Sequence, residues 1–238
     1  VNKAVLAATA DNASRIYGDA NPAFTASYTG FKNNEPASVI DTPPVGATIA
    51  TVTSNTGSYP ITLSGGLDNN YSFTYASGTL TVTKALATVT ADNKSRSYGD
   101  ANPAFTVSYS GLKNNETASV IDTAPVASAV ATASSAVGTY TITLSGGTDN
   151  NYIFTYTSGT LTITQAVLVA KADDLSRPYN TDNPALTISY SGFKNNETSS
   201  VLDAAAVATT TAVKTSLPGT YPITVSGGTD NNYSLTYQ

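Results

Sequence analysis

Residues 145–156 read Ser-Gly-Gly-Thr-Asp-Asn-Asn-Tyr-Ile-Phe-Thr-Tyr, and the same pattern stands at two other places in the chain. Its aspartates, Asp68, Asp149 and Asp230, are spaced 81 residues apart without insertion or deletion. A fixed period of this kind indicates a tandem array. The unit is longer than solenoid repeats, which span about 20–50 residues, and it is long enough to form a small core of its own. We therefore expect three small domains in a row rather than one continuous solenoid.

The period divides the chain into repeats 1, 2 and 3, at residues 5–85, 86–166 and 167–238. Residues 1–4 align with residues 82–85, so they are interpreted as the tail of a preceding repeat. Repeat 3 stops at the position equivalent to Thr157. It is therefore expected to lack the last strand, which repeat 2 contains at residues 159–163, and the chain is predicted to be a piece of a longer array.

Alternating apolar and polar residues in repeat 2 predict strands at 86–92, 105–109, 126–132, 140–145 and 152–156, and a last one through Leu161 and Ile163. Residues 96–103 are interpreted as a turn cluster, and residues 113–121 as a helical turn capped by Asn114 or Asn115. The predicted core is Phe105, Val107, Tyr109, Leu112, Val120, Ile121, Tyr140, Ile142, Leu144, Tyr152, Phe154, Tyr156, Leu161 and Ile163. Such a mainly-β unit with one short helical turn is either a β-sandwich or a β-grasp-like sheet packed on the turn. The position of the turn after two strands favours the grasp.

The composition narrows the chemistry of the chain. Cys, His, Trp and Met are absent, which excludes disulfides, ordinary zinc or copper sites and the commonest general base. Charged residues make up 11% and the net charge is −5, so no basic surface is available for nucleic acid. No apolar run approaches the 18 residues of a membrane span. We expect a non-enzymatic, monomeric segment without a cofactor and without membrane insertion.

Four sets of residues remain as candidate sites. Asp68, Asp149 and Asp230 are calcium candidates because each begins a run of three oxygen-bearing side chains, although Asx turns explain the run as well. Tyr17, Tyr98 and Tyr179 open the motif Tyr-Gly-Asp-x-Asn-Pro or its variant, and they are the candidates for contact with a ligand. Tyr98 is expected to be the most exposed ring. Asp100 and Asn102 of the same motif could offer oxygens to a ligand or to calcium, but a tight turn is the favoured interpretation.

The run Lys113-Asn114-Asn115-Glu116 contains the residue types of a Lys–Asn isopeptide bond with its acid. That bond requires all three side chains to be buried together, which neighbours in one polar loop achieve with difficulty. A solvated loop is therefore the favoured interpretation.

Three strings of repeat 2 resemble the MBG family, whose name stands for mostly-β and glycine-rich, in its Tyr-Gly-x type. They are Ser-Arg-Ser-Tyr-Gly-Asp-Ala-Asn-Pro at 95–103, Gly-Thr-Tyr-Thr-Ile-Thr-Leu-Ser-Gly-Gly at 138–147 and Asn-Tyr-Ile-Phe-Thr-Tyr-Thr-Ser-Gly-Thr-Leu-Thr-Ile-Thr at 151–164. The resemblance covers all three repeats. Repeat 3 departs from it where Gly99-Asp100 becomes Asn180-Thr181. The resemblance implies a module of large bacterial surface or secreted proteins of adhesin-like type, and it brings no catalytic residues.

The repeats are expected to form an elongated rod in which each touches its neighbours. Residues 79–90 cross from repeat 1 to repeat 2 without Gly or Pro, whereas a flexible linker would be rich in Gly and Ser. The last strand of one repeat should therefore continue almost directly into the first strand of the next. A spacer stalk outside the cell is the function predicted from these features. The alternative is a multivalent module in which each repeat binds a surface glycan or a protein ligand.

Overall fold

A computed structural model describes all residues, 1–238, of the chain. The chain is built of strands, and its only helices are three single 3-10 turns. It divides into two compact units. Unit 1 comprises Val1–Thr90, Ser108–Val126 and Ser145–Thr157, and unit 2 comprises Ala91–Val107, Ala127–Leu144 and Ser158–Gln238. The division runs through repeat 2, so the two sheets of that repeat belong to different units. The prediction of a mainly-β chain of three repeated sheet units is confirmed.

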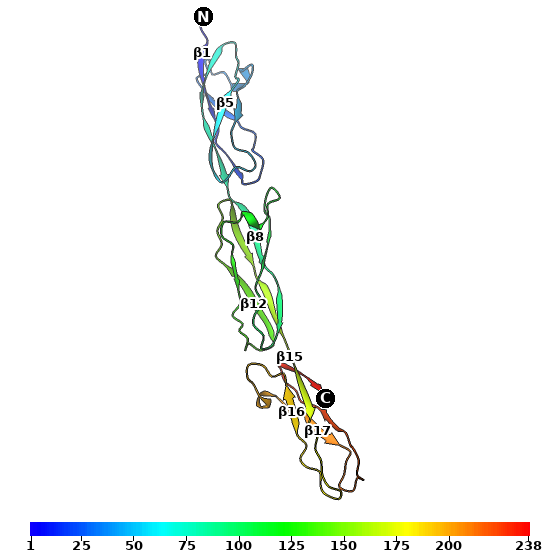
Figure 1. The fold of residues 1–238 in the computed structure, drawn as a ribbon. Coiled ribbons are helices and arrows are strands. Elements are labelled where there is room, and N and C mark those ends of the chain that lie inside the picture. Colours follow the sequence, from blue (N-terminus) through cyan, green and yellow to red (C-terminus); the bar gives the residue numbers. More distant parts are fainter. The chain divides into compact units, whose positions relative to one another are not determined.

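Repeat 1, drawn from blue to cyan in Figure 1, consists of two sheets. The first has the order β3-β1-β6, with β3 at Ala26–Thr29, β1 at Ala4–Ala10 and β6 at Tyr71–Ala76. The second has the order β2-β7-β5-β4, with β2 at Ala13–Ile16, β7 at Gly78–Thr83, β5 at Gly57–Ser64 and β4 at Val45–Ala47. The 3-10 turn η1 spans Ala37–Val39. In both sheets a parallel pair, β1 with β6 and β2 with β7, accompanies antiparallel neighbours.

The core of repeat 1 lies between these two sheets. Ala8 of β1, Ile61 of β5 and Leu80 of β7 are fully buried in one cluster. Their neighbours in sequence face outward, because side chains alternate between the two faces of a strand. The 3-10 turn η1 contributes no buried residue. The unit is therefore a sandwich of two sheets, and the preference for a β-grasp packed on a helical turn is wrong, because that turn is too short to cover a sheet.

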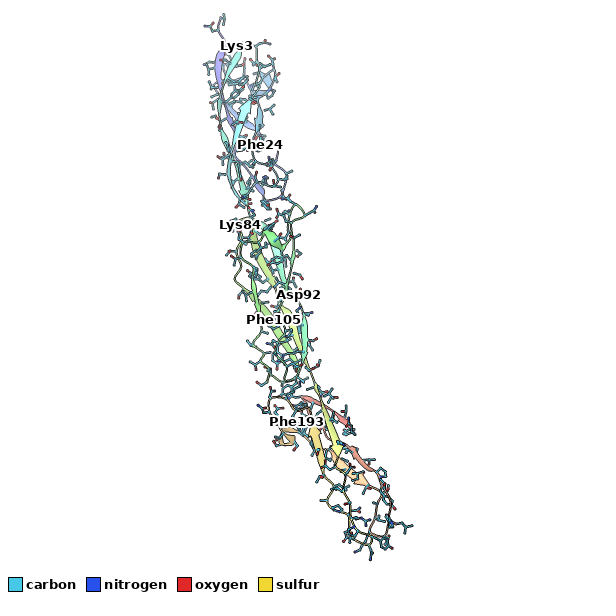
Figure 2. The ribbon with its side chains drawn as sticks, in the orientation of Figure 1. Lys3, Phe24, Lys84, Asp92, Phe105 and Phe193 are labelled. Carbon is cyan, nitrogen blue, oxygen red and sulfur yellow. The ribbon has the colours of Figure 1, made fainter.

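Unit 1 continues into the three-stranded sheet of repeat 2. This sheet has the order β10-β8-β13, with β10 at Val107–Ser110, β8 at Ala85–Ala91 and β13 at Tyr152–Thr157, and η2 at Ala118–Val120. Ala85, Ala87 and Tyr152 belong to the same buried cluster as Ile61 and Leu80 of repeat 1. Lys84 alone, labelled in Figure 2, separates β7 from β8. The prediction that one strand continues almost directly into the next is confirmed.

Unit 2 holds the other sheet of repeat 2 and all of repeat 3. The first sheet has the order β11-β12-β14-β9, with β11 at Val126–Ser128, β12 at Gly138–Ser145, β14 at Gly159–Thr164 and β9 at Lys94–Ser97. Repeat 3 has the sheets β16-β15-β19 and β17-β18, with β15 at Ala166–Ala172, β16 at Ile188–Ser191, η3 at Ser199–Val201, β17 at Val207–Thr210, β18 at Ile223–Ser226 and β19 at Tyr233–Tyr237. Leu161 and Ile163 of β14 pack in one cluster with Leu168 of β15 and Tyr233 of β19.

The local predictions for repeat 2 need three corrections. Arg96 lies in strand β9 rather than in a turn, and its side chain is buried. Asn114 and Asn115 do not cap a helix: both have left-handed backbone, and η2 begins only at Ala118. Val120 and Tyr156 are exposed rather than in the core. Val120 belongs to the surface turn η2, and Tyr156 stands near the end of β13, where its hydroxyl donates to the carbonyl of Gly146.

Candidate functional site: the junction between consecutive repeats

The run Lys113-Asn114-Asn115-Glu116 forms a tight turn in which Asn114 and Asn115 are exposed, as the interpretation as a solvated loop predicts. Asn114 and Asn115 have φ values of 53° and 58°, and the N–H of Glu116 donates to the carbonyl of Lys113 at 2.9 Å. Positive φ at both central positions is the geometry of a type I′ turn, which Asn tolerates better than most residues. The turn places the Lys113 and Glu116 side chains against the Tyr-Gly-Asp corner of repeat 1.

The carboxylate of Glu116 joins the two repeats through two tyrosines. Tyr17 of repeat 1 donates its hydroxyl to Oε1 at 2.5 Å, and Tyr152 of repeat 2 donates to Oε2 at 2.6 Å. The two rings meet edge to face, with centroids 5.5 Å apart. The hydroxyl of Tyr152 also accepts the N–H of Lys113 at 2.8 Å. Hydrogen bonds to a charged acceptor are roughly twice as strong as neutral ones, so this cluster is the strongest polar contact of the junction.

Gly18 leaves space for the Lys113 side chain, which forms the second contact between the two repeats. It has φ +80°, and a Cβ added there would lie 2.3 Å from Cβ of Lys113. The Lys113 side chain therefore passes directly over Gly18, and its Nζ reaches Oδ1 of Asp19 at 2.9 Å. Both side chains of this ion pair stay more than a third exposed, and exposed pairs contribute about 0–1 kcal/mol. In this string Tyr17 thus offers a hydroxyl to the following repeat, Gly18 leaves space for its Lys side chain, and Asp19 offers a carboxylate.

The Asp-Asn-Asn-Tyr loop provides a further contact to the preceding repeat. Oδ1 of Asp149 accepts the N–H groups of Asn151 and Tyr152 at 2.7 and 2.9 Å, which is an Asx turn. The turn directs Asn151 toward repeat 1, where its Oδ1 accepts the N–H of Thr56 at 3.0 Å. Lys84 donates from Nζ to the carbonyl of Asp149 at 2.7 Å. Lys84, which links β7 to β8, is therefore itself hydrogen-bonded to this loop.

Unit 2 contains a junction of the same construction between repeats 2 and 3. Tyr98 and Tyr233 donate their hydroxyls to the two oxygens of Glu197, each at 2.6 Å. Lys194 passes over Gly99, where an added Cβ would lie 2.2 Å from its Cβ, and pairs with Asp100 at 3.0 Å. Asn232 accepts the N–H of Val137 at 3.0 Å.

The first junction has two bonds that the second lacks. The hydroxyl of Thr56 donates to the carbonyl of Asn150 at 2.8 Å, and the Asn151 amide donates to Oδ1 of Asn55 at 3.0 Å. Ala136 and Val137 stand at the corresponding positions of repeat 2, and neither side chain has a polar atom.

The electrostatic environment keeps the junction tyrosines protonated. Burial, followed by the hydrogen bond to Glu116, raises the pKa of Tyr17 to about 12. Burial and the same carboxylate also raise the pKa of Tyr152. The hydrogen bond to Glu197, followed by burial, raises the pKa of Tyr98. These hydroxyls therefore remain donors throughout the neutral range, as the two bonds to each glutamate require.

The candidate ligand residues are largely occupied within the chain. Tyr17 and Tyr98 are each only 4% exposed, so the expectation that Tyr98 is the most exposed ring is wrong, because the following repeat covers it. Tyr179 is 60% exposed. Asp100 pairs with Lys194, while Asn102 accepts a bond from Arg96 and donates to the carbonyl of Ala131.

The calcium candidates Asp68, Asp149 and Asp230 all hold Asx turns. The N–H of Asn70 donates to Oδ1 of Asp68 and lowers the pKa of that carboxyl, against the effect of burial. Asp230 accepts the N–H groups of Asn232 and Tyr233 in the same way. The chain contains no cluster of three acidic side chains that could hold a metal ion.

Sequence reasoning missed the part that the Lys and Glu of this turn play in the junction. Lys32 and Glu35, Lys113 and Glu116, and Lys194 and Glu197 recur in register, although only 11% of the residues are charged. Recurrent charges in such a charge-poor chain were the available signal. It had no interpretation before the structure because their partners lie in the neighbouring repeat.

The three repeats match a known protein family. The profile of the MBG domain (YGX type) matches residues 6–81, 87–162 and 168–238. The comparison with curated proteins gave no match. Among solved structures, the I9–I11 tandem of titin covers 100% of this chain and 98% of its own, at 12% identity and a TM-score of 0.23. A likeness at that score carries no argument about fold or function.

Proposed function

We propose a structural function for this chain, which belongs to the MBG domain family (YGX type) and carries three such domains in tandem. The chain acts as a spacer stalk of a bacterial cell-surface or secreted protein of adhesin-like type, and it performs no catalysis. Its partners are the adjacent repeats of the same chain, and it works as a monomer. One observation carries the proposal: the same cluster of two tyrosines around one glutamate joins one repeat to the next, through Glu116 in unit 1 and Glu197 in unit 2.

A spacer must keep the angle between its modules, and three features of the junction restrict that angle. The linker is a single residue, Lys84 in unit 1 or Gln165 in unit 2. The apolar core is continuous across the linker in each unit. The tyrosine–glutamate cluster lies beside the linker and not on it, so bending at Lys84 would separate Tyr17 from Glu116. The hydrogen bonds beside this one-residue linker therefore resist bending of one repeat relative to the next.

An extracellular location agrees with the absence of Cys and with a weakly charged surface rich in Thr, Ser and Asn. No helix of the structure is of a length and hydropathy that would cross a bilayer. Multivalent binding of a glycan or protein remains the alternative function. It would need an exposed site that recurs in each repeat, and of the three tyrosines proposed for it only Tyr179 is exposed.

The experiment that tests the stalk measures the distribution of distances across one junction. Ser72 and Ile153 are equivalent, exposed positions in β6 and β13, and the chain has no Cys that would interfere with labelling. Spin labels at Ser72→Cys and Ile153→Cys should give a narrow distance distribution. The Glu116→Ala variant should broaden it by releasing both tyrosines.

Glu35→Ala is the matched control for this experiment. Glu35 accepts the hydroxyl of Tyr71 within repeat 1 at 2.7 Å, but no preceding repeat in the chain contacts it. The control should leave the distribution narrow. A broad distribution in the unaltered chain would show that the repeats move freely, and the stalk proposal would then be abandoned.

A further inference from the structure

The chain enters and leaves repeat 1 through strands that run in the same direction. It enters through β1 and β2 and leaves through β7. Strand β1 is parallel to β6 over residues 4–9, and β2 is parallel to β7 over residues 13–16. The N–H of Tyr17 extends the second pair with a bond to the carbonyl of Thr83 at 2.8 Å. The second entry strand is therefore bonded directly to the exit strand.

The direction of this pair decides how it responds to tension. When two neighbouring strands are parallel, the N-terminal end of one and the C-terminal end of the other lie at opposite ends of the pair. A pull on these two ends slides the strands along each other and strains all of their hydrogen bonds at once. In an antiparallel pair the two pulled ends would lie together, and the bonds would break one after another. The pair β2–β7 therefore has the geometry that resists a pull through the chain.

The exit strand is bonded on both of its sides. Residues 78–82 of β7 pair antiparallel with residues 57–61 of β5, so β7 lies between β2 and β5. In repeat 2 the exit strand β14 is parallel to β9 over residues 161–164 and antiparallel to β12 on its other side. A pull on the exit strand must therefore slide it past two neighbours.

The short strand β2 is held in place by a buried arginine. It has four residues and only one neighbour in its sheet. Arg15 donates from Nε to Oδ1 of Asn21 at 2.7 Å, and from its Nη2 to the carbonyl of Thr51. Asn21 donates in turn to the carbonyl of Ala50 at 2.7 Å. Hydrogen bonds from a charged donor are roughly twice as strong as neutral ones, so Arg15 fixes β2 to the segment that follows β4.

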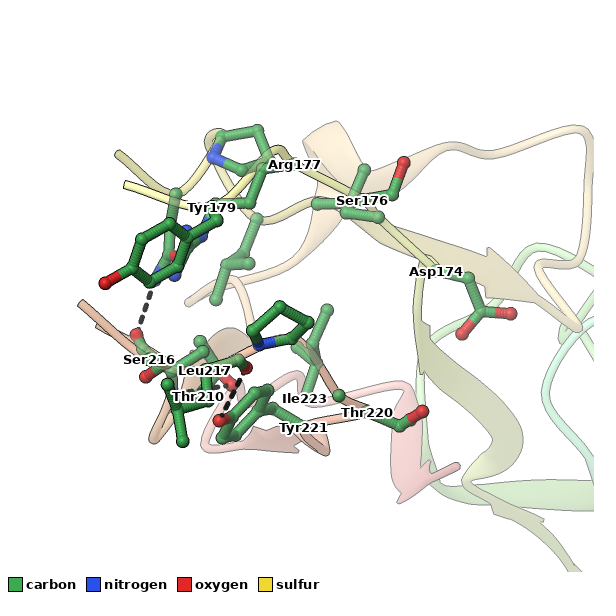
Figure 3. A pocket seen from close by; sticks show the side chains of 17 residues that line it. Asp174, Ser176, Arg177, Tyr179, Thr210, Ser216, Leu217, Thr220, Tyr221 and Ile223 are labelled. Atoms are coloured by element: carbon green, nitrogen blue, oxygen red, sulfur yellow. Dashed lines mark hydrogen bonds between the residues drawn. The ribbon is translucent and has the colours of Figure 1, made fainter. Parts of the chain in front are cut away.

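The same fixation recurs in the other two repeats. Arg96 and Asn102 bind the backbone carbonyls at the equivalent positions of repeat 2. Arg177, labelled in Figure 3, donates to Asn183, and both bind backbone carbonyls of repeat 3. These arginines and asparagines belong to the Tyr-Gly-Asp motif, but they have no part in the contact between repeats.

We propose that the repeats resist tension along the chain, through the parallel pair β2–β7 in repeat 1 and β9–β14 in repeat 2. Arg15 and Arg96 are positioning residues that keep the short entry strand against the exit strand. This inference rests on the proposed stalk function, because a stalk that connects two attachment points is pulled at both of its ends. The motif then has two functions: its Arg and Asn hold the entry strand, and its Tyr, Gly and Asp contact the next repeat.

The test pulls repeat 1 in two directions by single-molecule force spectroscopy on the whole chain, which has no Cys of its own. Handles at Val1→Cys and Leu86→Cys, both exposed, pull the repeat lengthwise. Handles at Ser14→Cys and Thr81→Cys, exposed and directly opposite in β2 and β7, pull the same pair crosswise. The lengthwise pull should need a force at least about twice that of the crosswise pull, because it strains all bonds of the pair together.

Substitutions then test the arginine. Arg15→Met should lower the lengthwise unfolding force, whereas Arg96→Met, the same change outside the handles, should leave it unchanged. Tyr28→Leu in β3 lies in neither parallel pair and serves as the control for lost stability. Arg15→Met should lower the force more than Tyr28→Leu for the same loss of unfolding free energy, measured with denaturant. If Arg15→Met does not fold, Asn21→Ala replaces it, because this change removes the acceptor of Nε.

Two results would overturn the proposal. One is a lengthwise force no higher than the crosswise force. The other is a loss of force in Arg15→Met no greater than in Tyr28→Leu at equal cost in unfolding free energy. The distance distribution across the first junction is measured separately. A narrow distribution with a low lengthwise force would retain the stalk and refute its resistance to tension, whereas a broad distribution would refute the stalk at any force.

Discussion

Tyr17 and Tyr179 stand at the same position of the same motif, yet one ring is 4% exposed and the other 60%. Tyr17 is held by the strand bond from its own N–H to the carbonyl of Thr83, by the ring of Tyr152 and by the carboxylate of Glu116. Tyr179 has none of these three contacts. The comparison shows that the strands before the last one do not bury the Tyr-Gly corner of their repeat. The last strand and the next repeat complete it together.

The repeats differ in sequence at the same corner. Gly18 and Gly99 allow a Lys side chain of the next repeat to pass over them, whereas Asn180, with φ 63°, stands at this place in repeat 3. Left-handed backbone alone is compatible with Gly or Asn. The close approach of Lys113 or Lys194 is compatible only with Gly. The glycine of the motif therefore serves the contact between repeats as well as the turn.

The largest effect is expected when repeat 3 receives the strand it lacks. Extending the chain by the sequence of residues 158–166 should raise the unfolding free energy of repeat 3 by about 2–4 kcal/mol, because two apolar side chains enter its core. Tyr179 should lose much of its exposure. The measurement is denaturant unfolding of both chains, followed at Tyr179. An extension with Ser in place of the Leu and the Ile is the control, and it should give little or no gain. Equal stability of all three chains would show that this strand does not belong to the core of the repeat.

Breaking the junction between repeats 1 and 2 should remove part of the difference in exposure between Tyr17 and Tyr179. Glu116→Ala leaves the hydroxyls of Tyr17 and Tyr152 without their acceptor, which should cost about 2–3 kcal/mol of unfolding free energy. Glu35→Ala releases only Tyr71 and should cost about half as much. Denaturant unfolding of the two variants gives both values. If the two substitutions cost the same, Tyr17 draws no stability from the junction.

A smaller effect is expected from closing the gap over which Lys113 passes. Gly18→Ala and Gly65→Ala both place Ala in left-handed backbone, at φ +80° and +78°, which costs about 1 kcal/mol. An added Cβ meets nothing within 4 Å at Gly65, but it meets Cβ of Lys113 at Gly18. We expect Gly18→Ala to cost about 1–2 kcal/mol more than Gly65→Ala. The melting temperatures of the two variants test this, and identical values would contradict the packing of Lys113 on Gly18.

The contribution of Tyr17 to the unfolding free energy should be independent of pH near neutrality and should change only in alkaline solution. The folded-state pKa of Tyr17 is raised to about 12, above the ordinary value of about 10. Its contribution to stability is therefore fully present below pH 10 and is lost as the pH rises toward about 12. The difference in unfolding free energy between the unaltered chain and Tyr17→Phe should be constant from pH 7 to 10 and then decline. Tyr179→Phe is the matched control in an exposed ring. A decline that begins below pH 9 would show that the hydroxyl of Tyr17 is not protected by the junction.

The sequence predicted the apolar strands better than it predicted the polar contacts that the strands make in the fold. The strands through Ile142, Tyr152 and Leu161 could be predicted from alternation alone, because each has a buried face and an exposed face. The polar and glycine-rich neighbours of Arg96 predict a turn at this residue. It lies instead on a strand, where its guanidinium is buried by bonds to Asn102 and to backbone carbonyls. A buried, fully bonded charge leaves no periodic apolar pattern, so alternation could not reveal it.

The sequence by itself determined the three-fold repetition, the mainly-β class and the direct passage of one strand into the next. These properties depend on period, on local alternation and on the absence of Gly and Pro, all of which can be counted along the chain. Only the tertiary structure decided that Tyr17, Lys113 and Glu116 form one contact and that Tyr98, Lys194 and Glu197 form another. Those outcomes depend on which residues, about a hundred positions apart, are brought within hydrogen-bonding distance. No local pattern encodes that distance, because it arises from the packing of one complete repeat on the next.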